Sequence, residues 1–144
     1  MAMDLKEIVF FIPHAKKLGL RFVETDGDAM IVEMPFQEAI VARKGSGIIA
    51  NGAVTTMMDT ALGAAVFKRL GEMRKLATLD LRMDFLRPCL PNHTVYSRTE
   101  CIRLTREVAF ARGVAWCDDP EKPVAQSMAA FSIAEISLDS GAGK

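Results

Sequence analysis

Cysteine and histidine are scarce in this sequence of 144 residues, which holds three of the first and two of the second. Cys89, Cys101 and Cys117 are odd in number and form no Cys-x-x-Cys pair, which argues against a disulfide framework or a zinc knuckle. Free thiols are typical of a reducing cytosol. His14 and His93 lie far apart without the spacing of metal ligands, so no metal site is expected.

The sequence also lacks a net charge and a long apolar run. Its 18 Lys and Arg balance 18 Asp and Glu, so bulk electrostatic binding to nucleic acid is not expected. The apolar run at residues 8–12 is far shorter than the roughly 20 residues that span a bilayer. The N-terminus lacks the small-residue cleavage site of a signal peptide. We therefore expect a soluble cytoplasmic protein with neither nucleic acid nor membrane as a partner.

Length and composition predict a single domain over residues 1–144, because half of the residues are apolar and disorder is excluded. A short helix is expected within residues 1–17, interrupted or ended by Pro13. Two strands, 19–24 and 29–34, are expected to form a hairpin at Asp26-Gly27. The Gly- and Ser-rich residues 138–144 are expected to be a flexible tail. Further strands are predicted by alternating polarity at 78–88, 94–105, 107–117 and 123–136.

The most distinctive segment is a helix expected over residues 53–70, with Asn51 as its N-cap and Gly71 as its C-terminal stop. Apolar or small residues cover nearly its whole circumference, which predicts burial on most sides. Long strands joined by short turns pair antiparallel around such a helix. The sequence therefore predicts an α+β fold in which an antiparallel sheet wraps around one long central helix.

Two features of this helix could carry chemistry. Asp59 is the one charged residue among the 23 between Lys44 and Lys68. It is either a structural carboxylate that holds a loop or faces solvent, or a general base or nucleophile. At the helix start, the N–H groups of Asn51 and Gly52 either belong to an ordinary capped helix or stabilise a developing oxyanion. The glycines of residues 45–50 match a dinucleotide-binding pattern only loosely, since no parallel βαβ unit follows.

The neutral total conceals a basic segment. Residues 68–112 carry 10 basic and 5 acidic side chains. These charges are either solvated strand faces or a local site for an anionic small molecule.

Residues 47–61, which read Gly-Ile-Ile-Ala-Asn-Gly-Ala-Val-Thr-Thr-Met-Met-Asp-Thr-Ala, resemble the signature of hotdog-fold acyl-CoA thioesterases of the phenylacetate-degradation type. In that family a glycine pair opens the central helix and a carboxylate follows about two turns later. Residues 78–88 resemble the strand after the helix, with its terminal proline, and the similarity extends over residues 13–136. Family members commonly carry His-Gly-Gly where this chain has Ala50-Asn51-Gly52.

The resemblance implies a hotdog fold and hydrolysis of a medium-chain or aromatic acyl-CoA to the free acid and coenzyme A. Coenzyme A is then part of the substrate, and no separate cofactor is implied. Asp59 would be the general base or nucleophile, and Thr78 would help to orient the water. The N–H of Asn51 or Gly52 would stabilise the oxyanion. The family resemblance further implies a homodimer or homotetramer in which Asp59 acts on substrate bound at the partner's helix start.

The same resemblance assigns residues to the two ends of the substrate. Coenzyme A would contact residues of the basic segment, and apolar side chains would line the acyl pocket. The coenzyme A residues are Arg87, Arg103, Thr105 and Arg106, and the acyl-pocket residues are Met57, Met58 and Phe85.

Two other functions are compatible with these residues. The missing histidine motivates a non-catalytic acyl-CoA-binding hotdog protein. A hotdog hydratase or dehydratase ranks last, because it needs a catalytic histidine beside a carboxylate and neither His14 nor His93 lies in a suitable helix.

Overall fold

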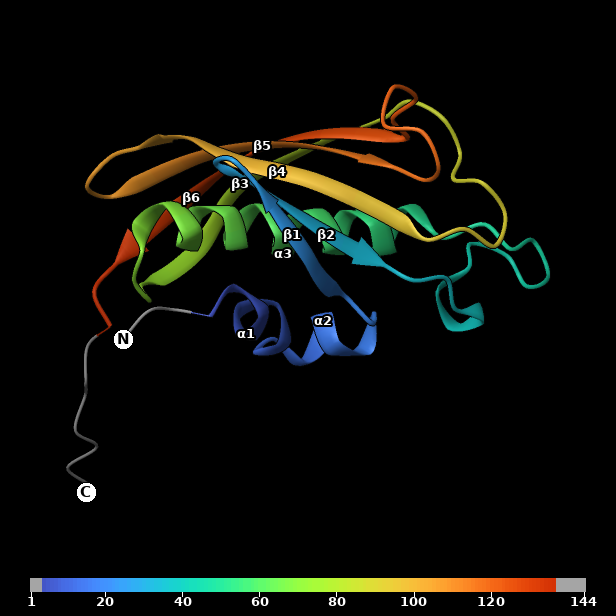
Figure 1. Cartoon of the computed structure of the whole chain (residues 1–144), viewed down its shortest axis with the longest axis horizontal. Helices are drawn as coiled ribbons and strands as arrows, with labels where there is room; N and C mark the ends of the chain where they lie inside the picture. The colour runs from blue at the N-terminus through green and yellow to red at the C-terminus, as the bar shows by residue number, and fades with distance from the viewer. Residues whose placement is uncertain (1–3, 137–144) are drawn as a thin grey trace, which may run out of the picture.

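The computed structural model of the chain, which describes residues 4–136, shows an antiparallel sheet laid across one long helix (Figure 1). This arrangement confirms the predicted α+β hotdog fold. The elements in chain order are α1 (Leu5–Phe10), α2 (Pro13–Lys17), β1 (Arg21–Asp26), β2 (Ala29–Met34), the 3-10 helix η1 (Glu38–Ile40), α3 (Asn51–Leu70), β3 (Lys75–Phe85), β4 (Val95–Leu104), β5 (Val108–Trp116) and β6 (Ala125–Ala134).

The sheet has the strand order β1-β2-β4-β5-β6-β3, and all neighbouring strands run antiparallel. The strand that follows α3 therefore crosses the molecule to the far edge, so β1 and β3 are the edge strands. α3 packs against one face of the sheet, and α1 and α2 lie on the other side of α3 (Figure 1). Within residues 4–136, no helix is both long and apolar enough to cross a membrane.

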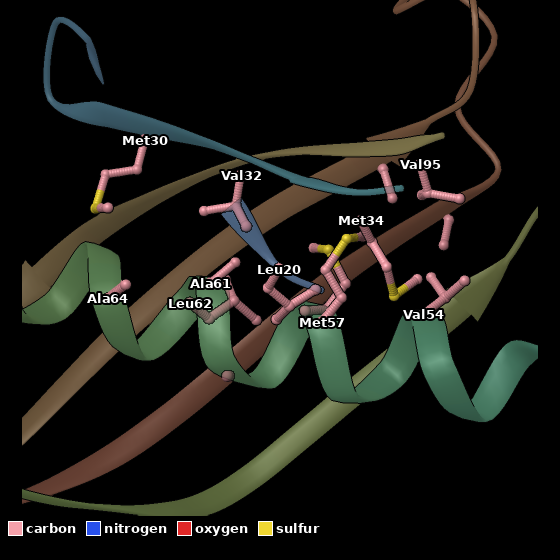
Figure 2. Close-up of a cluster of buried hydrophobic side chains, with 14 of the residues drawn as sticks. Leu20, Met30, Val32, Met34, Val54, Met57, Ala61, Leu62, Ala64 and Val95 are labelled. Carbon is pink, nitrogen blue, oxygen red and sulfur yellow. The ribbon is translucent and has the colours of Figure 1, made fainter. Parts of the chain in front are cut away.

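The core lies between α3 and the sheet. Figure 2 shows Met30, Val32 and Met34 of β2 directed towards α3, and all three are fully buried. Burying one such side chain stabilises the fold by roughly 1.5–3 kcal/mol. Eight residues of α3 are buried: Val54, Met57, Met58, Ala61, Leu62, Ala64, Ala65 and Val66.

The C-terminal end of α3 was predicted correctly, whereas its N-terminal end was not. Gly71 adopts the left-handed conformation (φ 71°) and ends the helix as expected. Asn51 is the first residue of the helix and not its N-cap, a position that Ala50 occupies without a side-chain hydrogen bond. The expected Asn51 cap is therefore wrong, and the helix starts two residues earlier than residue 53.

The N-terminal region also differs from expectation in detail. Pro13 begins a second helix, α2, because its fixed φ and missing N–H suit a first helical position. The β1–β2 turn consists of residues 27–28, since Asp26 pairs with Ala29. Gly27 supplies the positive φ of 59° that this turn requires. The expected tail at residues 138–144, and residues 1–3 of the N-terminal segment, lie outside the described residues.

A β-bulge interrupts the predicted alternation of β3. The register with β6 shifts between Thr78 and Asp80, so Leu79 is an extra residue on the strand and is 60% exposed. A bulge bends its strand and redirects the neighbouring side chains. In β3 it lies directly beside Thr78.

Close packing between β5 and α3 provides a test of this fold. A Cβ at Gly113 would lie 2.7 Å from Thr99 Cγ2, 2.9 Å from Met58 Cε and 3.0 Å from the Arg98 carbonyl oxygen. We expect Gly113→Ala to lower the free energy of unfolding by about 1–3 kcal/mol in urea denaturation, because this core has no room for a methyl group. At Gly52 a Cβ meets nothing within 4 Å, so Gly52→Ala should not lower the free energy of unfolding. Equal losses in both variants would contradict the packing.

Candidate active site

A carboxylate and a hydroxyl meet beside the edge strand β3. The Thr78 hydroxyl donates a hydrogen bond of 2.8 Å to Asp59 Oδ1. Asp59 is half-buried near the middle of α3, and Thr78 is exposed on β3 immediately before the bulge. The structure thus brings together two of the predicted catalytic residues from different elements.

Asp59 has no basic partner among residues 4–136, where none of the ion pairs includes it. A carboxylate accepts through two oxygens. Because Thr78 occupies one position, the remaining lone pairs are left for water or a substrate proton. A carboxylate oriented in this way can serve as a general base.

The start of α3 presents two backbone donors that have no acceptor among residues 4–136. Ala50, the N-cap residue, has no side-chain acceptor, and the Thr55 and Thr56 hydroxyls donate back to the carbonyls of Asn51 and Gly52 at 2.9 and 3.0 Å. The N–H groups of Asn51 and Gly52 are therefore left for another acceptor. Both residues are exposed, and the helix dipole adds partial positive charge at this point.

An open cleft of about 460 Å³ lies at the same end of α3. Asn51, Phe85 and Arg87 line it together with apolar residues of the preceding loop. Three residues predicted for different roles, in oxyanion stabilisation, acyl binding and coenzyme A binding, therefore share one cleft. The cleft therefore combines a residue of the helix start, an aromatic side chain and a cation.

The two halves of the predicted catalytic group do not meet within one chain. Asn51 and Asp59 are eight residues apart on α3, which corresponds to about 12 Å along the helix axis. One carbonyl group cannot contact both, because hydrogen bonds require about 3 Å. A single chain therefore holds a carboxylate–hydroxyl pair and a separate donor cleft.

The predicted coenzyme A residues likewise occupy two ends of the sheet. Arg87 follows the end of β3, whereas the β4–β5 turn with Arg103 and Arg106 lies level with the beginning of β3, since Val108 and Ala77 both pair with Ser132. The Thr105 hydroxyl donates to the Val108 carbonyl at 2.8 Å and closes that turn. Thr105 therefore shapes the turn in this structure.

The basic segment separates into paired and unpaired arginines. Arg98 pairs with Asp26 and Arg112 with Glu100, each at 2.8 Å. Within residues 4–136, none of the ion pairs involves the predicted set: Arg87, Arg103 and Arg106. The three arginines expected to meet an anion are thus in no ion pair in the part of the chain that the structure describes.

The predicted acyl-pocket residues are not grouped together. Phe85 is 40% exposed in the cleft, whereas Met57 and Met58 are fully buried in the core. In one chain the methionines form the packing beneath the sheet, and their part in an acyl pocket stays a prediction.

A second cleft, of about 480 Å³, lies on the sheet face opposite α3 and was missed from the sequence. Alternating charges on β3, β4 and β5 are the signal that could have located it, with Arg82, Arg98 and Arg112 among its lining residues. Each of these arginines is paired with a carboxylate. The positive charges of this cleft are therefore balanced by neighbouring carboxylates, and the cleft lies away from Asp59.

Comparison with known proteins now identifies the family. A sequence profile described as the thioesterase superfamily matches residues 46–124. The matched residues include the start of α3, Asp59, Thr78 and the β4–β5 turn. The chain belongs to the thioesterase superfamily. No match was found among curated proteins.

Solved structures of other chains are similar to this one. A protein of Pseudomonas aeruginosa is 35% identical, with a TM-score of 0.81 over 89% of this chain and 95% of its own. A thioesterase of Haemophilus influenzae is similar in fold at 18% identity, with a TM-score of 0.82 over 97% and 96%. A mutant phenylacetic acid degradation protein of Thermus thermophilus is 21% identical, with a TM-score of 0.70 over 84% and 98%. Thioesterases act on acyl thioesters.

Proposed function

We propose that this member of the thioesterase superfamily hydrolyses an acyl-CoA of the medium-chain or aromatic class to a carboxylic acid and coenzyme A. The observation that carries the proposal is the Asp59 carboxylate, held by the Thr78 hydroxyl at 2.8 Å beside an exposed sheet edge. Asp59 takes a proton from water, and the water oxygen attacks the thioester carbonyl. The tetrahedral intermediate then expels the coenzyme A thiolate, which receives the proton from the Asp59 carboxyl group.

The oxyanion of that intermediate needs donors that one chain does not place near Asp59. We therefore propose that the active site forms between two copies of the chain. The N–H groups of Asn51 and Gly52 from one copy would stabilise the oxyanion, while Asp59 of the other activates the water. The separation of about 12 Å along α3 supports this division, because neither half can complete the site alone.

The exposed edge of β3 supports pairing of the two copies. Leu79 and Leu86, on and just beyond this strand, are 60% and 48% exposed, and an unpaired strand edge is a template for another strand. Two copies of β3 related by a two-fold axis pair antiparallel. The Thr78 half of one strand would then lie beside the Phe85 half of the other, next to the cleft at that helix start.

The same pairing would unite the separated basic residues. Arg103 and Arg106 lie at the Thr78 end of the sheet, and Arg87 lies at the Phe85 end. An antiparallel pair of chains would place the β4–β5 turn of one copy at the same end as Arg87 of the other. Arginine is well suited to phosphate and pyrophosphate groups, because its guanidinium forms two parallel hydrogen bonds with them.

The specific feature that favours a second candidate is Ala50. The family commonly has histidine there, whereas this chain has a methyl group at the N-cap of α3. The second candidate is an acyl-CoA-binding protein without hydrolysis. Saturable binding of acyl-CoA in calorimetry, with no release of free thiol over hours, would identify it and reject the enzyme.

Substitution of the carboxylate tests the proposed chemistry. We expect Asp59→Asn to lower kcat by about 100-fold or more, because the amide cannot accept the proton while it keeps the shape and the Thr78 hydrogen bond. Release of coenzyme A from a panel of acyl-CoAs is followed with a thiol reagent. Asp84→Asn, which removes a carboxylate of β3 on the opposite face of the sheet, should retain turnover. Unchanged kcat in Asp59→Asn would reject the assignment.

Mixing two inactive variants tests the shared site. Gly52→Leu should block the donors at the helix start, since the space above Gly52 is open in one chain. When the Gly52→Leu and Asp59→Asn chains are refolded together, we expect about one quarter of wild-type activity. Random pairing makes about half of the dimers heterodimers, and each heterodimer has one intact site out of two. Each variant alone should stay inactive. An inactive mixture that contains heterodimers would place both groups in one chain.

The arginine assignment is tested with two substrates. We expect the double variant Arg103→Ala, Arg106→Ala to raise KM for an acyl-CoA about tenfold or more, because charged hydrogen bonds to phosphate are lost. KM for a small acyl thioester without the nucleotide should not change. Arg112→Ala, whose guanidinium is paired with Glu100 on the opposite face, is the matched control. Equal effects on both substrates would show that the turn does not bind the nucleotide.

A further inference from the structure

Cys89 and Cys117 form a pair of thiols that the proposed hydrolysis does not use. Cys89 lies in the β3–β4 loop and Cys117 directly follows β5, and the two are 6% and 4% exposed. Both are free. The two loops that carry them lie at the same end of the sheet, opposite the β4–β5 turn (Figure 1).

A hydrogen bond places the Cys117 sulfur against the residue that follows Cys89. The Leu90 N–H donates to the Cys117 sulfur at 3.4 Å. A second hydrogen bond joins the two loops, because the Leu86 N–H donates to the Val124 carbonyl at 2.8 Å. The two cysteines thus lie on adjacent loops, as a disulfide bond between them requires.

The surroundings make the two thiols chemically different. The neighbouring Cys89 thiol, the Leu90 N–H and His93 lower the pKa of Cys117, although burial and Asp118 oppose this effect. The Cys117 thiol and burial raise the pKa of Cys89. Cys117 is therefore the more acidic of the two thiols, and the thiolate is the reactive form of cysteine.

We propose that Cys89 and Cys117 are a modification site, a dithiol that a peroxide converts reversibly to an intramolecular disulfide. The Cys117 thiolate attacks one oxygen of hydrogen peroxide, the O–O bond breaks, and Cys117 becomes a sulfenic acid while hydroxide leaves. The Cys89 sulfur then attacks the Cys117 sulfur, and the S–S bond replaces the S–OH bond. The proton of Cys89 leaves with the hydroxyl group as water.

The site adjoins the candidate active site without being part of it. Cys89 follows Pro88, which together with Arg87 lines the cleft at the start of α3. The disulfide would tie this wall of the cleft to the end of β5. Its formation does not depend on the proposed hydrolysis, so the chemistry can be tested without any activity measurement.

Mass spectrometry of the full chain tests the proposal. The reduced protein is treated with hydrogen peroxide, unfolded and alkylated with iodoacetamide. We expect the oxidised protein to bind two fewer alkyl groups than the reduced one. Proteolysis should yield a peptide that joins Cys89 to Cys117, and dithiothreitol should restore the alkylation of all three thiols. Cys101→Ser is the matched control, because Cys101 is a half-buried thiol of β4 outside the pair, and it should still form the bond.

Two further variants test the order of steps. In Cys89→Ser the resolving thiol is absent, so the sulfenic acid at Cys117 should persist and react with dimedone. In Cys117→Ser neither the disulfide nor the dimedone adduct should form at Cys89. The proposal is overturned if the oxidised wild-type protein still binds three alkyl groups, or if its cross-link joins Cys101 or two separate chains.

Discussion

The burial of α3 against the sheet is the interaction on which the rest of the structure depends. The inner face of β5 is lined by Ala109, Ala111, Gly113 and Ala115, and the three alanines are fully buried. Small residues there let the helix approach closely enough for large side chains such as Met58 to fill the space, so packing remains dense. The position and direction of α3 are thereby fixed, and with them both ends of the candidate site.

A charge on such a helix is costly to bury, and this cost explains where Asp59 lies. Asp59 is only half-buried, on the side of α3 that is near the edge strand β3. The bulge at Leu79 adjoins the residue whose hydroxyl meets the carboxylate, Thr78. The fold keeps one polar position open on an otherwise apolar helix, and that position faces the exposed edge strand of the sheet.

Much of this arrangement could be predicted from the sequence. The apolar circumference of α3, its stop at Gly71 and the alternating strands fixed the fold class, because these patterns act locally. The isolation of Asp59 in 23 residues marked it as special. The cap at Ala50 was missed because it depends on a tertiary contact and not on the local preference for Asn at such a position. The Ile40 carbonyl of the preceding loop accepts the Ala50 N–H at 2.9 Å and fixes where the helix begins.

What the sequence by itself determined is therefore the set of elements, the buried faces and the residue types available for chemistry. The tertiary structure alone decided which of them meet. Thr78 reaches Asp59, Arg98 and Arg112 are neutralised by carboxylates, and the Leu90 N–H reaches the Cys117 sulfur, 27 positions away. Such contacts depend on strand order and register, which arise from the packing of the whole chain and leave no periodic signal in a local segment.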